Sequence, residues 1–93
     1  MRALDSPAAM GAVVSRAVDI GINHLETAPS YGPAETYLGA ALAALARDQP
    51  EQRADLVITS KLLPTFDVAE AWCQLQGSLQ RLGVDRLDNL ALH

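Results

Sequence analysis

The regular spacing of three short apolar segments restricts the fold more than any other feature of the sequence. Segments with the composition of β-strands begin at Ile22, Leu56 and Leu87. These starts lie about thirty residues apart, which is the length of a strand, a loop and a crossover helix. Repeats of this length predict parallel strands. Right-handed crossovers then leave two arrangements, a sheet that curls into a barrel or an open doubly wound sheet with helices on both faces.

Helical periodicity in the remaining segments predicts three helices and the element order αβαβαβ. The helices are expected over residues 7–21, 33–47 and 67–82. Ser6 and Pro7 are the residue types that begin a helix, and Pro33 suits the first position of the second one. The polar stretch 48–55, which contains Pro50, is interpreted as the connection into the second strand.

The third predicted helix carries the clearest apolar stripe of the chain. The stripe consists of Val68, Ala71, Trp72, Leu75, Leu79 and Leu82. We expect this face and Trp72 to be buried in the core, and we expect Cys73 beside it to behave as a small hydrophobic residue.

The composition argues against several classes of function. Apolar residues make up 49% of the chain and charged residues 19%, as in globular proteins. A net charge of −4 without a dense Lys/Arg run argues against nucleic acid or anionic lipid as a partner. No run approaches the roughly 18 apolar residues of a membrane span, and Asp5 stands where a signal peptide would begin its apolar stretch. We therefore expect a soluble, cytoplasmic protein.

Two further absences in the sequence restrict the possible binding sites and the possible folds. Cys73 is the only cysteine, so neither an intrachain disulfide nor a Cys/His metal cage can form, and no metal site is expected. No Gly-x-Gly-x-x-Gly follows a strand and no Gly-Lys-Ser/Thr loop is present. Because an open sheet that binds phosphate uses such loops, their absence favours the barrel over a small doubly wound phosphate-binding domain.

Titratable residues lie where the three predicted strands end. Glu26 ends the first strand and Tyr31 lies in the loop after it, while Lys61 and His93 end the second and third strands. In parallel barrels the active site forms at these carboxyl ends. Such groups suit proton delivery to a carbonyl oxygen during hydride transfer. A cation at Lys61 would ease proton release from Tyr31, Glu26 would hold the lysine, and a neutral His93 would donate a hydrogen bond to the carbonyl.

Each of these residues, taken alone, also has an ordinary structural interpretation. Lys61 can be a solvated charge, Tyr31 a packing residue, Glu26 a solvated strand end and His93 a frayed chain end. Their order along three successive strands favours a shared site. His24 is assigned a structural role, on the interpretation that its side chain does not share the face of Glu26.

A set of motifs resembles the aldo-keto reductase family over nearly the whole chain. The motifs are HLETAPSYGPAE at 24–35, YLG at 37–39, ITSK at 58–61, SLQRL at 78–82, DRLD at 85–88 and LH at 92–93. The resemblance implies a (β/α)8 TIM barrel that reduces aldehydes or ketones with NADPH, using a catalytic tetrad of Asp, Tyr, Lys and His in which Tyr donates the proton. Tyr31, Lys61 and His93 match that tetrad, and Glu26 stands at the position of the aspartate. Some iron-sulfur-linked members resemble this chain in carrying Glu-Thr-Ala.

The resemblance also implies that residues 1–93 are the N-terminal portion of an incomplete barrel domain with about three βα units. The expected substrate is a small carbonyl compound, and the NADPH-binding residues are expected beyond His93. We expect the isolated chain to be inactive, with the missing remainder of the barrel as its partner. The alternative is a non-catalytic partial-barrel remnant or subunit that binds a partner chain through its exposed strand edges.

Overall fold

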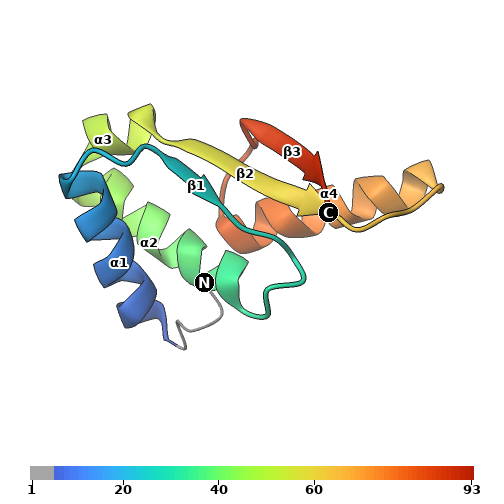
Figure 1. Cartoon of the computed structure of the whole chain (residues 1–93), viewed down its shortest axis with the longest axis horizontal. Helices are drawn as coiled ribbons and strands as arrows, with labels where there is room; N and C mark the ends of the chain where they lie inside the picture. The colour runs from blue at the N-terminus through green and yellow to red at the C-terminus, as the bar shows by residue number, and fades with distance from the viewer. Residues whose placement is uncertain (1–5) are drawn as a thin grey trace.

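The computed structural model describes residues 6–93, in which seven elements follow one another as helices and strands (Figure 1). The elements are α1 (Pro7–Asp19), β1 (His24–Glu26), α2 (Ala34–Asp48), α3 (Pro50–Asp55), β2 (Val57–Leu62), α4 (Val68–Leu82) and β3 (Asn89–Leu92). The predicted alternation of helices and strands is confirmed. The argument from Asp5 concerning a signal peptide lies outside the described residues.

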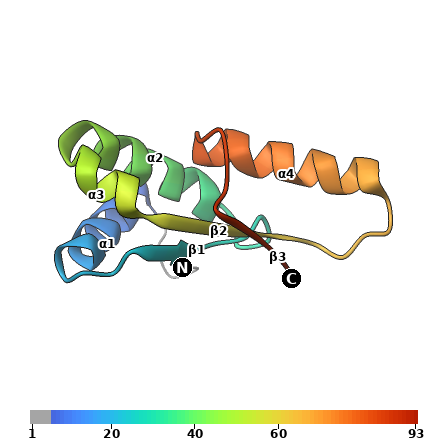
Figure 2. The same ribbon diagram turned by 90° about the horizontal axis from the view of Figure 1, so that it is seen from above.

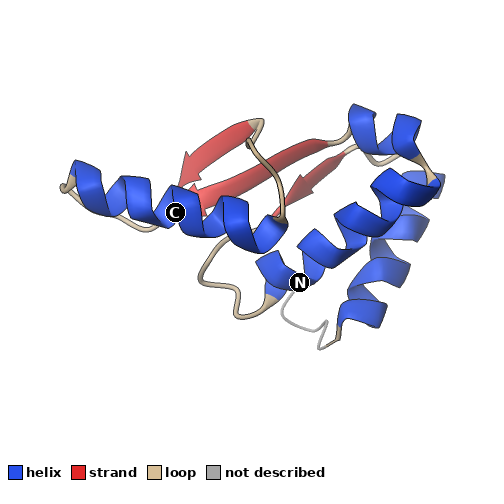
Figure 3. Ribbon diagram, turned by 180° about the vertical axis from the view of Figure 1, so that it is seen from behind, coloured by secondary structure: helices blue, strands red, loops and turns tan. Residues whose placement is uncertain are grey.

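The three strands form one parallel sheet in the order β1-β2-β3. Glu26 is in register with Thr59, and Lys61 is in register with Ala91. The helices lie together on one side of the sheet (Figures 2 and 3). We call the other side the open face. One covered face is the arrangement of a barrel segment and differs from a doubly wound sheet, which has helices on both faces.

The core lies between the sheet and the helices, with α2 at its centre. The fully buried large apolar side chains are Met10 of α1, Leu38 of α2, Ile58 of β2 and Leu82 of α4. Burial of each such side chain contributes about 1.5–3 kcal/mol. The core therefore fixes α2 between α1 and α4, behind the strands.

Local signals determine where the helices begin and end. Ser6 Oγ accepts a hydrogen bond of 3.1 Å from the Ala9 amide and caps α1, as predicted. Asp67 Oδ1 accepts one of 2.9 Å from the Ala69 amide and caps α4. Gly83 follows α4 with φ of 68°, a left-handed conformation that glycine adopts without strain.

Two predictions about the fold need correction. The stretch 48–55 contains the short helix α3, because Pro50 at its first position already has a helical φ and Glu51 lies in its first turn. The expected burial of Trp72 is wrong, since its exposed fraction is 59% and Cys73 is exposed too. The first half of α4 extends past the strands (Figure 2), so the described chain leaves the start of the apolar stripe, at Val68 and Trp72, exposed.

Within residues 6–93, no helix combines the length and the apolar character required to cross a membrane.

Candidate active site

Four polar side chains gather at the edge of the sheet where the parallel strands end. Glu26 is the last residue of β1, Lys61 lies near the end of β2, and His93 directly follows β3. Tyr31 comes from the loop between β1 and α2. Figure 1 shows the three strands running in the same direction, so that this edge collects the loops that follow them. We call these four residues the edge cluster.

Lys61 is the centre of the edge cluster. Its Nζ lies 2.8 Å from Glu26 Oε1 and donates a hydrogen bond of 2.7 Å to Tyr31 Oη. The same Nζ lies 4.6 Å from the centroid of the Tyr31 ring. Hydrogen bonds from a charged donor are stronger than neutral ones. One ammonium group therefore orients a carboxylate and a phenol at the same time.

The contact between Lys61 and Glu26 shifts the ionisation of both groups. The hydrogen bond from Lys61, reinforced by its positive charge, lowers the pKa of Glu26 below 4.5. The hydrogen bond to Glu26, followed by the one to Tyr31, raises the pKa of Lys61 above 10.5. Both groups are consequently charged at neutral pH, and the cation next to Tyr31 is present under ordinary conditions.

His93 completes the edge cluster. Its ring lies edge-on to Tyr31, with centroids 5.8 Å apart and planes at 72°. Its Nδ1 lies 3.4 Å from Ser30 Oγ, and its backbone amide donates a hydrogen bond of 2.9 Å to Leu62 O. The backbone at His93 thus continues the pairing of β3 with β2, which counts against the interpretation of His93 as a frayed residue.

A second group of polar side chains lies on the open face, further from the carboxyl edge. His24 Nε2 lies 2.8 Å from Thr59 Oγ1, and Asn89 Nδ2 donates a hydrogen bond of 3.3 Å to the same oxygen. Residues two apart in a strand point to the same side, so His24 shares the face of Glu26. The sequence-based argument that separated them is wrong, although a structural role for His24 agrees with its contact to Thr59.

A third polar group lies behind the sheet and was missed by the sequence analysis. Glu35 of α2 is only 1% exposed. Its Oε2 accepts a hydrogen bond of 2.7 Å from Ser60 Oγ, and its Oε1 accepts one of 2.8 Å from Arg81 Nε. The sequence placed Glu35 in the first turn of a helix, where an acidic residue needs no further explanation. Its partner Arg81 is 46 residues away, which no local pattern indicates.

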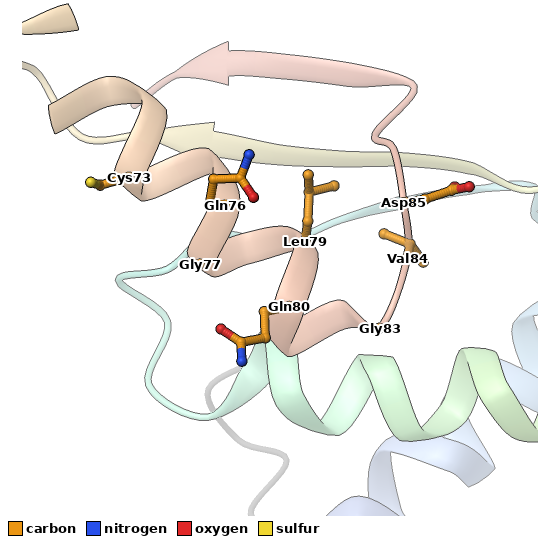
Figure 4. Close-up of a pocket in the computed structure, with 8 residues that line it drawn as sticks. All are labelled: Cys73, Gln76, Gly77, Leu79, Gln80, Gly83, Val84 and Asp85. Atoms are coloured by element: carbon orange, nitrogen blue, oxygen red, sulfur yellow. The ribbon is translucent and has the colours of Figure 1, made fainter. Parts of the chain in front are cut away.

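Another hollow of the surface formed by the described residues has a different lining. It lies along α4 and the turn that follows it (Figure 4), with Cys73 and Asp85 at opposite ends. In the part of the chain that the structure describes, no three His, Cys, Asp or Glu residues are arranged to hold a metal ion.

Comparisons with known proteins agree on one family. The sequence model of the "Aldo/keto reductase family" matches residues 5–93. A Synechocystis protein described as "Aldo/keto reductase slr0942" is 38% identical over 89 residues, which are 95% of this chain and 27% of that protein. The chain spans between 26% and 28% of the length of three curated relatives that it matches.

Solved structures show the same likeness in three dimensions. An aldo-keto reductase in complex with NADPH aligns with a TM-score of 0.82 and 31% identity, over 96% of this chain and 27% of that one. The aldose reductase from Schistosoma japonicum also aligns with a TM-score of 0.82, at 32% identity, over 96% of this chain and 30% of its own. The α/β fold described above is therefore the fold of a segment of these barrels.

Proposed function

The chain belongs to the aldo/keto reductase family, and we propose that it forms the front part of an NADPH-dependent oxidoreductase that reduces an aldehyde or ketone to an alcohol. The observation that carries the proposal is the position of Lys61 Nζ, 2.8 Å from Glu26 Oε1 and 2.7 Å from Tyr31 Oη. A phenol held by a charged lysine suits the transfer of a proton to a carbonyl oxygen.

Tyr31 is the proposed proton donor. Lys61 donates its own hydrogen to Tyr31 Oη, so the phenol can direct its proton outwards to a substrate oxygen. When bound, a reduced nicotinamide supplies the hydride that adds to the carbonyl carbon. The C=O double bond then becomes a C–O single bond, and the oxygen takes the proton of Tyr31. The ammonium of Lys61 stabilises the phenolate that remains.

His93 is the proposed orienting group for the substrate. Its ring lies against the Tyr31 ring, and Ser30 Oγ lies near Nδ1. If Nδ1 accepts a hydrogen bond from Ser30 Oγ, the ring proton lies on Nε2. The Nε2–H group can then donate a hydrogen bond to the substrate oxygen. Such a donor fixes the carbonyl next to the phenol and favours the negative charge that develops on its oxygen.

Glu26 is proposed to replace the aspartate of the tetrad. Its side chain is one methylene longer, yet its carboxylate reaches Lys61 at 2.8 Å. About half of the Glu26 side chain (54%) stays exposed while it is paired, so the cluster remains accessible from the open face. The likeness to iron-sulfur-linked members stays a prediction.

The rest of the active site is proposed to come from further βα units of a complete barrel. Residues 6–93 supply the groups that move a proton, and we propose that other parts of the barrel bind NADPH. The apolar side chains of Val68, Trp72 and Leu92 are 84%, 59% and 81% exposed, which supports packing against additional elements. We propose that residues 1–93 are inactive in isolation. A cytoplasmic location is also proposed, because the sequence contains a single cysteine and so forms no intrachain disulfide.

A reductase assay on the barrel that contains this segment tests the proposal. Small aldehydes and ketones are supplied with NADPH, and the oxidation of NADPH is followed by absorbance. The substitution Tyr31→Phe is expected to lower turnover by roughly 10²–10⁴-fold, because it removes the general acid. The matched control is Tyr37→Phe, which deletes the same hydroxyl from a residue of α2 that packs against the core. Turnover that survives Tyr31→Phe would contradict the proposed role.

The second candidate function is a non-catalytic subunit. The observation that favours it is the same set of exposed apolar side chains, to which Phe66 adds a fully exposed ring. A stable stoichiometric complex with another chain, together with no carbonyl reduction by that complex, would select this function over the first.

A further inference from the structure

The buried carboxylate of Glu35 is a group that the proposed proton transfer does not use. It is 1% exposed, and a buried carboxylate is costly unless it is paired and hydrogen-bonded. Ser60 Oγ and Arg81 Nε each donate to one of its two oxygens, at 2.7 Å and 2.8 Å. The three residues belong to α2, β2 and α4. One side chain therefore joins three elements that are distant in the sequence.

The approach of α2 to α4 next to Glu35 is unusually close. Gly39 lies one helical turn after Glu35 and so shares its face of α2. A Cβ atom at Gly39 would collide with the backbone carbonyl oxygens of Arg81 and Leu82. The end of α4 thus lies directly on the first turns of α2, and the carboxylate is fixed against Arg81 at this crossing.

The same carboxylate is linked to the edge cluster through both Ser60 and Tyr31. Ser60 immediately precedes Lys61 in β2, so Ser60 points to the helices when Lys61 points to the open face. Tyr31 lies four residues before Glu35, and the tight turn between them is closed by a hydrogen bond of 3.3 Å from the Ala34 amide to Tyr31 O. The groups on the two sides of β2 are therefore connected through very short stretches of backbone.

We propose that Glu35 is a positioning residue, which fixes Tyr31 Oη next to Lys61 Nζ by holding the start of α2 against β2 and α4. The effect of this positioning role on catalysis rests on the proposed function. The expected effect on turnover is large, because a misplacement of about 1 Å between reacting groups can reduce turnover by about 10²-fold. Side chains that act in chemistry need such support from groups that do not take part in it.

The charge of Glu35 is essential to this role. Glutamine has the same shape, and its carbonyl oxygen can still accept from Ser60. Its amide nitrogen, however, is a donor, so glutamine satisfies both partners only when its oxygen accepts from Arg81 and its nitrogen donates to Ser60 Oγ, and the contact to Arg81 then has no negative charge. Glu35→Gln therefore weakens the contact to Arg81 without creating a void.

The experiment follows Lys61, the only lysine of the sequence. In protein labelled with ¹³C and ¹⁵N lysine, the side-chain signals of Lys61 are those that disappear in the variant Lys61→Arg. The nuclear Overhauser effect between the Lys61 Hε protons and the Tyr31 ring reports their contact, and a pH titration of the ¹³Cε shift reports the lysine's environment. Glu35→Gln is expected to weaken the Overhauser effect and to move the titration midpoint down towards that of an ordinary lysine. Arg81→Gln is expected to do the same.

The control for a general loss of stability is Leu45→Ala. Leu45 is buried near the far end of α2, away from the edge cluster, and its truncation weakens the same helix without touching Glu35. It is expected to lower stability and leave both signals of Lys61 unchanged. If Glu35→Gln does not fold, Ser60→Ala is measured in its place, and a weaker Overhauser effect is expected because Glu35 loses one of its donors.

The outcomes separate this inference from the proposed function. A folded Glu35→Gln protein, or Ser60→Ala in its place, with both Lys61 signals unchanged would overturn the positioning role and leave the reductase proposal intact. Altered Lys61 signals in a barrel that reduces no carbonyl substrate would support the positioning role and contradict the reductase proposal. In an active barrel, Glu35→Gln is expected to lower kcat more than it changes KM.

Discussion

Two ion pairs on opposite sides of β2 have the same nitrogen to oxygen distance and opposite surroundings. Lys61 and Glu26 are 2.8 Å apart on the open face, where the lysine side chain is 13% exposed and the carboxylate 54%. Arg81 and Glu35 are also 2.8 Å apart behind the sheet, where the carboxylate is 1% exposed and the guanidinium 42%. The accessible carboxylate belongs to the first pair and the buried one to the second.

The difference in burial predicts different roles for two pairs with equal distances. A pair with an accessible carboxylate is screened by water and contributes little to stability, so its charges can respond to a substrate. A buried carboxylate cannot lose its cation without a large cost, so the pair that contains it stays fixed. We infer that the Lys61 pair serves chemistry and that the Arg81 pair serves geometry.

The largest effect is expected from removal of the cation on the open face. In an active barrel, Lys61→Met should lower turnover by about 10²–10⁴-fold, because Tyr31 loses the charge that assists proton transfer. Its thermal midpoint should stay close to that of the wild type. Steady-state kinetics and thermal unfolding measure the two quantities. If Lys61→Met lowered the thermal midpoint as well as turnover, the two pairs could not be distinguished by their roles.

The next largest effect is expected from removal of the cation behind the sheet. Arg81→Met leaves the carboxylate of Glu35 buried without its cation, which should lower the free energy of unfolding by about 3 kcal/mol. Urea unfolding followed by circular dichroism measures this change. Arg47→Met is the matched control, since its pair with Asp48 is 73% and 62% exposed and its loss should have no measurable effect. Similar results for both variants would show that burial of Glu35 does not matter.

A smaller effect is expected at the crossing of α2 and α4. Gly39→Ala places a methyl group against the carbonyl oxygens of Arg81 and Leu82, which should cost about 1–3 kcal/mol. Gly11→Ala is the matched control, because a Cβ there meets nothing within 4 Å and alanine should stabilise α1 by about 0.5–1 kcal/mol. Changes of opposite sign in the free energy of unfolding, measured in urea, would support the close crossing of α2 and α4. Stabilisation by both substitutions would contradict it.

The smallest effect is expected from pH acting on the pair of Lys61 and Glu26. The pKa of Glu26 is lowered in the folded state, so its contribution is complete above 4.5 and disappears as the pH falls through the lowered value. The pKa of Lys61 is raised, so its contribution is complete below 10.5 and disappears as the pH rises through the raised value. The thermal midpoint of wild type should therefore exceed that of Glu26→Gln only between these limits. If the difference in thermal midpoint persisted at both low and high pH, it would not arise from the ion pair of Lys61 and Glu26.

Local features of the fold were predictable from the sequence because they depend on few neighbouring residues. The spacing of the strands and the caps at Ser6 and Asp67 are of this kind. The first strand is shorter than expected, since the Ile22 amide donates to Ala17 O and helps to end α1. Trp72 shows the limit of periodicity. An apolar stripe identifies one face of a helix, but it does not indicate whether residues 6–93 include an element that covers that face.

The candidate site was predictable only on the open face. Parallel strands bring their carboxyl ends together, and the structure accordingly places Glu26, Tyr31 and Lys61 in contact and His93 against Tyr31. Their catalytic roles stay predictions. The partners of Glu35 could not be predicted, because its pairing with Arg81 requires the crossing of two helices that are formed by separate parts of the chain.

The parallel connection of the strands also determines when the edge cluster can form during folding. Tyr31 and Lys61 are 30 residues apart, with α2 and α3 between them, and Ser30 and His93 are 63 residues apart, with α4 between them as well. Contacts between residues far apart in sequence form slowly, because a long loop must close before they yield any stabilisation. The helices, whose hydrogen bonds are local, are expected to form earlier. The contact between Tyr31 and Lys61 therefore marks a late event in folding, and a partly folded chain would keep much of its helix signal without an assembled site.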